Sequence, residues 1–482
     1  MIMSKTIKES GQVFTPSYIV CHMLDLCGYK YGKKILRKHV IDNSCGNGAI
    51  LCEVVDRYCQ SYLNWNENSL WLKSELETYI HGIDNDPAAV EQCIINLNDV
   101  CLKYGIEGVS WDIFLGDTLI EERFNNQMDY VIGNPPYVRT HNLNDSYEAV
   151  KQYNFTQTGM ADLYVTFFEI GINMLNKHGK LCYITPSSWT TSKAGNMMRQ
   201  YFKSHKLLRA IIDMEHYDVF ENFSVYTMIT FLDKKYQNDI FTYNRFNAEG
   251  LRVEKVDTLN VNDVDINGEF YFTSKEDLEM LTDIKTHSYD KVFCVKNGIA
   301  TLLDKVFINE DLPFDAYTTQ MLKASTGTWS KCFFPYDRFG NPIPTTEVQQ
   351  NDDVMKYLLE HRTALLKRKC DSGIEDWFYY GRSQGLRDTF RERLAINSII
   401  KDVQTIKFNI VPEGCGVYSG LYIYSETEDI SIARQYLETD EFIRYVKSLK
   451  KYKSGGFYTY SSKDVESYLN YKMSKNIWNI YE

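Results

Sequence analysis

The first half of the chain alternates short apolar runs with segments of helical periodicity, and this alternation is the strongest constraint on its fold. Such an alternation is typical of a mostly parallel sheet covered by helices. In the segment 162–175, Leu163, Phe167, Ile170 and Met174 recur at helical spacing and predict one face packed on a core. The predicted strands number seven and cover 40–41, 79–83, 113–115, 129–132, 180–184, 209–213 and 226–232.

A chain of 482 residues is too long for one ordinary hydrophobic core, so at least two domains are expected. The polar stretch 233–239 has no apolar periodicity and predicts a domain boundary. Beyond it, short β-like runs, glycine-containing turns and a few helices predict a mixed α+β domain. We therefore expect an α/β domain with a seven-stranded sheet over 1–240 and an α+β domain over 241–482.

Charge and cysteine usage restrict the class of protein. A formal net charge of −11 argues against a protein that coats nucleic acid nonspecifically, although basic runs at 367–369, 387–393 and 447–453 allow a localised basic cleft. The 12 cysteines include no CxxC pair and no set at zinc spacing, so neither a disulfide framework nor a metal is expected. No leader and no membrane-spanning apolar stretch is apparent, which predicts a cytoplasmic protein with no membrane partner.

A glycine-rich turn follows the first predicted strand. The strand ends in Asp42, and Gly46 and Gly48 precede the next helix. Glycines allow the backbone to approach a ligand closely at the carboxyl end of a strand. The third glycine of the dinucleotide fingerprint and the Lys-Ser/Thr pair of the phosphate loop are both missing, so neither of those motifs is met.

Two further strands also end in acids. Asp84 closes the second strand, where a carboxylate can accept hydrogen bonds from both ribose hydroxyls of a nucleoside. Asp117 closes the third strand and suits an adenine amino group, although a helix cap explains a single acid at such a position equally well. Three successive acids at one sheet edge suit a ligand with an adenosine and a cationic end.

The most specific segment is Asn134-Pro135-Pro136-Tyr137, directly after the fourth predicted strand. An exocyclic amine such as that of adenine is a poor nucleophile because its lone pair is delocalised into the ring. The Asn134 side-chain oxygen and the Pro135 carbonyl can each accept one amine hydrogen and so polarise the nitrogen. The prolines stiffen that carbonyl, and Tyr137 offers a ring face for stacking.

Together these segments resemble the gamma-class N6-adenine DNA methyltransferases of restriction-modification systems, the TaqI-like group. The segment 12–16 resembles the amino-terminal cofactor motif of that family, and Ala161-Asp162-Leu163-Tyr164 resembles a motif lining its site. Phe220 stands where the family places an aromatic ring against the flipped base, and Phe223 is the alternative. Asn43 and Ser44 depart from the Pro-Ala that often follows the first acid.

The resemblance implies a fold, a cofactor and a reaction. The fold is a Rossmann-like methyltransferase domain followed by a DNA target-recognition domain, and the reaction is site-specific methylation of adenine N6 in double-stranded DNA by S-adenosyl-L-methionine. A separate cognate restriction endonuclease, not required for activity, is a candidate partner of a stand-alone modification enzyme. The implied catalytic residues are Asn134, Pro135, Pro136, Tyr137 and Phe220. The implied cofactor-binding residues are Thr15, Pro16, Asp42, Ser44, Cys45, Gly46, Gly48, Asp84, Asn85, Asp117, Thr118 and Asp162.

The second half offers candidate DNA contacts. Its segments 377–386 and 454–460 resemble parts of TaqI-like specificity domains. Arg382 and Gln384 are residue types that contact guanine and adenine edges, and Lys451 and Lys453 are natural phosphate contacts. Arg139, just after the catalytic segment, is a further candidate.

Other readings remain open. The same polarising chemistry serves methylation of a protein glutamine amide and of ribosomal RNA adenine, whereas enzymes acting on cytosine N4 more often carry serine in place of Asn134. A catalytically inert DNA-binding relative is a further alternative, against which the intact Asn134–Tyr137 segment speaks.

Overall fold

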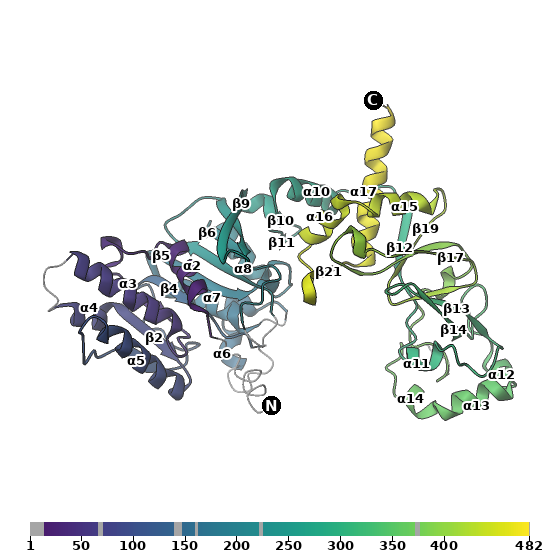
Figure 1. Ribbon diagram of the computed structural model, residues 1–482, viewed down its shortest axis with the longest axis horizontal. Coiled ribbons are helices and arrows are strands. Elements are labelled where there is room, and N and C mark those ends of the chain that lie inside the picture. The colour runs from purple at the N-terminus through teal and green to yellow at the C-terminus, as the bar shows by residue number, and fades with distance from the viewer. Residues whose placement is uncertain are drawn as a thin grey trace. The chain divides into compact units, whose positions relative to one another are not determined.

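The computed structural model describes residues 14–65, 71–138, 147–159, 162–220, 225–371 and 376–481. The chain divides into two compact units (Figure 1), the first ending at Leu278 and the second beginning at Glu279. In the described residues, no helix combines the length and the apolar character that crossing a membrane requires.

A nine-stranded mixed sheet forms the centre of the first unit, with the strand order β3-β2-β1-β4-β5-β7-β6-β8-β9. β1 pairs in parallel with β2 and β4, β3 joins β2 in parallel, and β5 joins β4 in parallel. β7 lies antiparallel between β5 and β6. The predicted strands all form, as β1 (Val40–Asp42), β2 (Ile80–Asp84), β3 (Asp112–Leu115), β4 (Met128–Gly133), β5 (Leu175–Pro186), β6 (Leu208–Asp213) and β7 (Thr227–Asp233).

Helices cover both faces of this sheet. On one face, α2, α3 and α5 share a core with the alternate strand residues Val40, Ile132, Cys182 and Ile212. On the other face, α7 packs on β4 and β5, and the ring of Phe168 lies 5.3 Å from that of Tyr183. The helices of this unit are α2 (Ser17–Cys27), α3 (Ala49–Trp65), α4 (Leu72–Tyr79), α5 (Pro87–Leu102), α6 (Tyr147–Lys151), α7 (Leu163–Met174), α8 (Asn196–Ser204), α9 (Val261–Val264) and α10 (Lys275–Thr286), the last of which continues into the second unit.

The predicted core stripe of α7 is confirmed. Leu163, Phe167, Ile170 and Met174 are all buried. The helix is in fact buried almost all round, since polar Thr166 and Glu169 are buried as well. Glu169 keeps its carboxylate satisfied by accepting hydrogen bonds from the backbone N–H groups of residues 154 and 155, at 3.1 and 2.8 Å.

The sheet is larger than predicted because two strands follow residue 239. β8 (Ile240–Asn247) pairs in parallel with β6, and β9 (Arg252–Asn260) pairs antiparallel with β8. Phe241 and Tyr243 on β8 are fully buried. The predicted count of seven strands is therefore wrong, and the predicted boundary at residue 240 falls inside the first unit. The polar stretch 233–239 is a surface connection between strands of one sheet.

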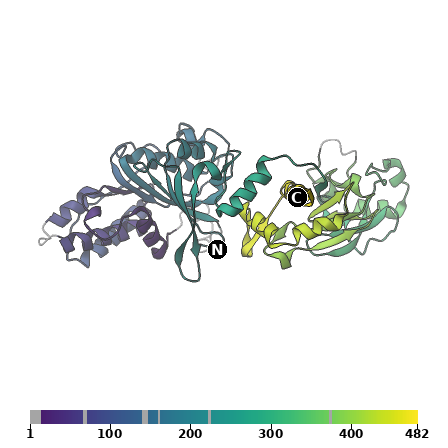
Figure 2. The ribbon, with the colours of Figure 1, turned by 90° about the horizontal axis from the view of Figure 1, so that it is seen from above.

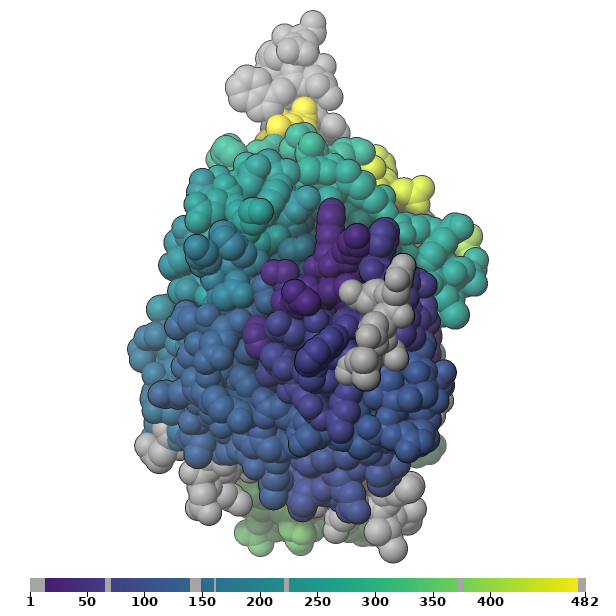
Figure 3. Space-filling view, turned by 90° about the vertical axis from the view of Figure 1, so that its left-hand side faces the viewer, coloured from purple at the N-terminus to yellow at the C-terminus, as the bar shows by residue number. Residues whose placement is uncertain are grey.

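The amino-terminal helix packs against this added hairpin. Figure 3 shows the purple amino-terminal segment between blue and teal parts of the first unit. His22 Nε2 lies 2.9 Å from the carbonyl oxygen of Leu251, and the ring of Tyr18 stacks 6.1 Å from that of Phe246. The hairpin thus belongs to the unit that carries the predicted cofactor motifs.

The second unit mixes short sheets with helices (Figure 2). Its largest sheet is antiparallel, in the order β12 (Phe293–Asn297), β19 (Leu421–Ser425), β15 (Arg393–Ile396), β17 (Phe408–Val411). One smaller sheet has the order β14 (Thr328–Phe333), β13 (Thr318–Lys323), β18 (Gly416–Tyr418), and another has the order β16 (Ile399–Ile400), β21 (Phe457–Thr459), β20 (Tyr452–Lys453). In the first unit, β10 (Asp265–Ile266) and β11 (Glu269–Phe270) form a separate two-stranded ribbon. The helices are α11 (Asp304–Phe307), α12 (Thr345–Val348), α13 (Asp352–Glu360), α14 (Arg362–Leu366), α15 (Ile430–Leu437), α16 (Asp440–Ser448) and α17 (Ser462–Tyr481).

The extent of the first unit can be tested with two fragments. A fragment of residues 1–278 is expected to fold and to unfold cooperatively. A fragment of residues 1–240 should aggregate or unfold at a lower temperature, because it exposes the edge of β6 and removes the buried Phe241 and Tyr243. Thermal unfolding and size-exclusion chromatography provide the comparison, and equal stability of the two fragments would contradict the assignment of β8 and β9 to the sheet.

Candidate functional site

The glycine turn after β1 is held in place by the neighbouring strand. The Gly46 N–H donates to Asp84 Oδ2 at 2.8 Å, and the Cys45 N–H donates to the Ile83 carbonyl at 2.9 Å. Gly48 has φ +84°, and a Cβ there would lie 2.7 Å from the Cys93 Sγ, so only glycine fits. The turn is therefore a rigid, narrow backbone segment at the carboxyl edge of the sheet.

Two of the three predicted strand-end acids are buried beside this turn. Asp42 is 2% exposed and Asp84 is 8% exposed. Burial raises the pKa of Asp42 to about 8, with a further contribution from the Asp84 charge, and burial also raises the pKa of Asp84. Among the described residues, no cationic side chain lies within ion-pair distance of either carboxyl group. A cationic ligand would therefore meet two acids that lack a positive partner.

The third acid has a different local role. Asp117 is half-buried, and its Oδ1 accepts a hydrogen bond from the Leu119 N–H at 2.9 Å within a turn at 118–120. No helix begins in the described residues between β3 and β4, so the helix cap considered as its alternative does not form. Next to it, Thr118 is buried and donates to the Asn43 carbonyl at 2.6 Å. This bond links the loop after β3 to the turn after β1. Asn85 is exposed after β2, while Pro16 is half-buried.

Two residues of the predicted cofactor motifs hold the predicted catalytic segment, residues 134–137, in place. Asn134 Nδ2 donates to the Thr15 hydroxyl at 3.1 Å, and the Ser44 hydroxyl donates to the Asn134 carbonyl at 3.3 Å. The preceding Gly133 packs so closely that a Cβ there would lie 3.1 Å from Asp42 Oδ1. Thr15 thus fixes the side chain of Asn134 from 119 positions away along the chain, and Ser44 fixes its backbone from 90 positions away.

Aromatic rings gather after this segment. The Tyr137 ring lies 5.9 Å from that of Phe220 and 6.5 Å from that of Tyr164, both in edge-to-face geometry. The Tyr137 hydroxyl donates to the Ile184 carbonyl at 3.1 Å, and burial raises its pKa. Phe220 is 3% exposed, so access to its face would require a movement of its neighbours. Asp162 precedes α7 and is half-buried.

Asn43, one of the two residues that depart from the family pattern, has a structural partner that sequence reasoning missed. The Tyr183 hydroxyl on β5 donates to Asn43 Oδ1 at 2.8 Å, and Asn43 is fully buried. A Cβ on Gly133 would also lie 3.1 Å from the Tyr183 ring. Tyr183 therefore contacts both the turn after β1 and the residue that precedes Asn134. It lies 140 positions from Asn43 inside an apolar strand, and no local pattern distinguishes it from a core tyrosine.

The predicted DNA contacts of the second unit are already engaged within it. Arg382 pairs with Asp371, and Lys451 Nζ pairs with Asp464 at 2.6 Å. Gln384 Nε2 donates to the Gly298 carbonyl at 2.6 Å, while Lys453 is exposed. Arg139, the residues 12 and 13 of the amino-terminal motif, and Phe223 lie outside the described residues.

Comparisons with known proteins identify relatives. Residues 62–220 match the model of the family described as Eco57I restriction-modification methylase. The chain is 23% identical over 492 residues to the type II restriction enzyme and methyltransferase RM.Eco57I of Escherichia coli, covering 81% of this chain and 49% of that protein. It is 28% identical over 234 residues to the type II methyltransferase M.BstVI of Geobacillus stearothermophilus, covering 46% of this chain and 41% of that protein. The chain thus spans less than half the length of these two relatives.

The fold has a counterpart among solved structures. The type IIL restriction-modification enzyme MmeI, solved in complex with DNA, superposes with a TM-score of 0.63 at 11% identity, over 92% of this chain and 63% of MmeI. The matched family segment contains Asp84, Asp117, the Asn134–Tyr137 segment and Phe220. The resemblance expected from the motifs is confirmed: in sequence and in fold, this chain is similar to the methyltransferases of restriction-modification systems.

Proposed function

We propose that this chain is a methyltransferase of the restriction-modification type that transfers a methyl group from S-adenosyl-L-methionine to N6 of an adenine in double-stranded DNA. The observation that carries the proposal is the fixed position of Asn134. Its amide and its carbonyl are held by Thr15 and Ser44, at the sheet edge where Asp42 and Asp84 are buried.

The residues at this edge fit the cofactor. S-adenosyl-L-methionine supplies a methyl group on a positively charged sulfur and also carries an ammonium and an adenosine. The carboxyl group of Asp42 is buried without a cation, so a cationic ligand would favour its ionised form. Asp84 uses one lone pair of each oxygen for the N–H groups of Gly46 and Asp86, at 2.8 and 3.0 Å. Its remaining lone pairs suit two ribose hydroxyls.

Asn134 would activate the target amine. The hydrogen bond from Nδ2 to Thr15 fixes the rotation of the amide, and the bond from Ser44 fixes the backbone on the other side. With the amide held, Oδ1 and the Pro135 carbonyl can accept the two amine hydrogens without reorganisation during the reaction. Pro136 restrains that carbonyl by its fixed φ. Such orientation contributes roughly 7–11 kcal/mol in well-aligned reactions.

The target base would leave the duplex to reach this site. Adenine N6 is paired within the helix, so the nucleotide has to rotate out before an in-line transfer. Tyr137 stands directly beyond Asn134 and Pro135, and its ring adjoins that of Phe220. Stacking of a base on such a ring contributes about 1–3 kcal/mol of favourable free energy, which offsets part of the free energy needed to extrude the nucleotide.

The second unit, residues 279–482, would hold and read the duplex. The relatives named above are type II enzymes, and RM.Eco57I combines restriction and modification in its name, whereas M.BstVI is named a methyltransferase alone. We propose Arg382, Gln384, Lys451 and Lys453, with Arg139 in the first unit, as DNA contacts. A separate cognate endonuclease, not required for methylation, remains part of this proposal.

Replacing Asn134 by alanine tests the proposed role of its amide. Asn134→Ala should slow methyl transfer by about 10²–10³-fold, the loss typical of one preorganised polar group, while cofactor affinity stays nearly unchanged. Thr15→Val removes only the hydroxyl that orients the amide and should give a smaller loss. Single-turnover methylation of DNA and calorimetric cofactor titration make the measurements. Substantial turnover in Asn134→Ala would show that the amine is activated in another way.

The raised pKa of Asp42 predicts a pH dependence. Below about 8 the cofactor-free protein holds a proton on Asp42 that a cationic ligand expels, so affinity should increase with pH, by at most about tenfold per unit, and level off above 8. Without ligand, the unfolded state loses this proton at lower pH than the folded state, so the Asp42 contribution to stability falls as pH rises toward 8.

Asp42→Asn is the matched control for this titration. The variant should lose the pH slope of cofactor binding and gain thermal stability in the ligand-free state near pH 8. Calorimetry in buffers of different ionisation enthalpy gives the number of protons released on binding. Any ionisation of the ligand itself affects the wild type and the variant equally, so it cancels in the comparison. An identical slope in the variant would exclude Asp42 as its source.

Base extrusion can be followed by fluorescence. A 2-aminopurine at the target position should brighten on binding, because it leaves the stack. Tyr137→Ala should change that signal and slow transfer, whereas Tyr130→Phe on β4 keeps a buried ring outside the site and serves as the control. A mismatch opposite the target should tighten binding. A probe that stays quenched in a complex competent for methylation would contradict extrusion.

A further inference from the structure

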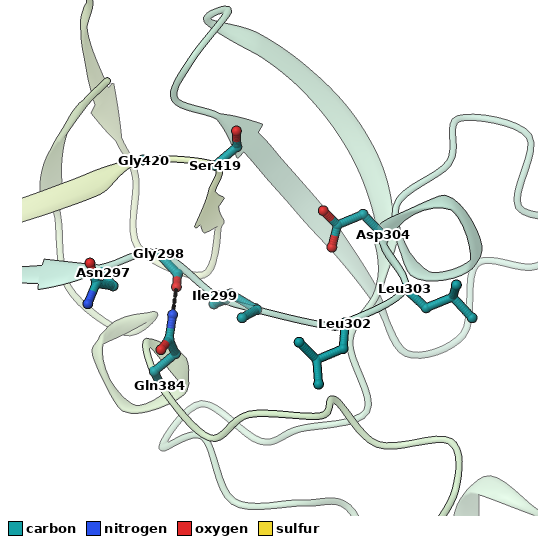
Figure 4. A pocket seen from close by; sticks show the side chains of 10 residues that line it. Asn297, Gly298, Ile299, Leu302, Leu303, Asp304, Gln384, Ser419 and Gly420 are labelled. Carbon is teal, nitrogen blue, oxygen red and sulfur yellow. Dashed lines mark hydrogen bonds between the residues drawn. The ribbon is translucent and has the colours of Figure 1, made fainter. Parts of the chain in front are cut away.

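The second unit contains a cavity of about 580 Å³ at one end of its four-stranded sheet. Asn297 closes β12 on one side, Ser419 and Gly420 precede β19 on the other, and Gln384 comes from a third segment (Figure 4). A second cavity of about 340 Å³ shares Asn297 and Gln384 with the first. The two cavities therefore adjoin each other within this unit, and we call them together the groove.

The groove presents hydrogen-bond acceptors. Asp304 extends its carboxylate into the cavity (Figure 4). Its Oδ1 accepts a hydrogen bond from the Thr301 hydroxyl at 2.6 Å, and its Oδ2 has no partner among the described residues. The Gln384 Nε2 donates one of its two hydrogens to the Gly298 carbonyl, and this bond fixes the orientation of the amide and leaves its carbonyl oxygen as an acceptor for a ligand. That oxygen can accept a hydrogen bond from an amine of a ligand.

Other features restrict what fits. The Asn297 amide is exposed and has no hydrogen-bond partner in the part of the chain that the structure describes. Leu302 holds an exposed apolar side chain at φ +62°, a conformation that costs energy for a bulky residue. Gly381 makes room for it, since a Cβ there would lie 2.4 Å from Leu302 Cδ1. An apolar group thus stands beside the acceptors.

The charge pattern separates the interior of the groove from its rim. The Asp304 carboxylate would repel a phosphate inside the first cavity. In the second cavity, Lys296 is neutralised by Asp388 at 2.8 Å, whereas Arg387 is exposed and forms no ion pair among the described residues. An interior of acceptors with one unpaired cation at its rim suits a nucleic acid base edge with its backbone phosphate outside.

We propose that this groove reads an exocyclic amine of a base, N6 of adenine or N4 of cytosine, in the major groove of the recognition sequence, through Gln384 and Asp304. The inference rests on the proposed function and adds to it the chemical group that is recognised. Asn297 is assigned the neighbouring base atom, and Arg387 the adjacent phosphate. These contacts are separate from those to the extruded adenine.

Amine deletion in the DNA tests the assignment. Once sequencing of methylated positions has given the site, each adenine or cytosine other than the target is replaced in turn by purine or pyrimidin-2-one, which lack the amine. The full chain should lose about tenfold in affinity at one such position, within the range of 1–3 kcal/mol for a base contact. Gln384→Met and Asp304→Asn should bind the natural duplex more weakly than the wild type does. Deleting the amine at that position should then cause no further loss of affinity in these variants.

The controls make the outcomes distinct. Glu428→Gln changes an exposed residue elsewhere in the unit, and this variant should show the same loss of affinity as the wild type when the amine is deleted. A 7-deaza analogue keeps the amine and should reduce the affinity of all the proteins equally. Any effect of an analogue on the duplex itself cancels, because all proteins meet the same DNA. If amine deletion reduces the affinity of the wild type and of both variants equally at every position, this groove does not recognise an amine, although the proposed function is unaffected. If the wild type neither binds nor methylates any duplex selectively, both are overturned.

Discussion

The hydrogen bond between the Asp84 carboxylate and the Gly46 N–H is the contact on which the rest of the site depends. It ties the glycine turn after β1 to the end of β2, and this turn places Ser44 within hydrogen-bond distance of the Asn134 carbonyl after β4. The bond is charge-assisted when Asp84 is ionised, and such bonds are roughly twice as strong as neutral ones. Any change that protonates or removes Asp84 therefore reaches Asn134 through the turn.

The carboxyl edge of the sheet brings together residues that are far apart in the chain. Parallel strands end at one edge, so the loops after β1, β2, β3 and β4 must meet there. Thr15 joins them from before α2, and Tyr183 supports them from β5. The geometry of Asn134 is thus a property of the whole sheet, and local sequence alone does not determine it.

This explains how far the sequence could be interpreted. The strand ends, the glycine turn and the Asn134–Tyr137 segment were predictable, because each combines a local pattern with a chemical requirement. The contact of Tyr183 with Asn43 was not, since a tyrosine in an apolar strand has no distinguishing pattern. The strands β8 and β9 were placed in the wrong domain because a polar connection looks the same whether it joins domains or strands.

In the second unit, the sequence did not reveal which basic side chains are already paired with acids. Arg382 was predicted as a contact to a base edge and Lys451 as a phosphate contact, yet they already pair with Asp371 and Asp464. Residue type alone does not reveal such partners, because the acids lie 11 and 13 positions away and meet them only in the folded unit.

The exposed Arg382–Asp371 pair contributes little stability, typically about 0–1 kcal/mol, so exchanging its carboxylate for a phosphate costs little, whereas Asp464 is buried. The released acid would then stand close to the DNA backbone and repel it. A protein with a net charge of −11 can therefore hold a duplex only where cations outnumber acids locally, and salt should weaken that grip steeply. In the recognition proposed above, specificity would then come from acceptors such as Gln384 and Asp304, because the phosphate contacts of such a surface are few.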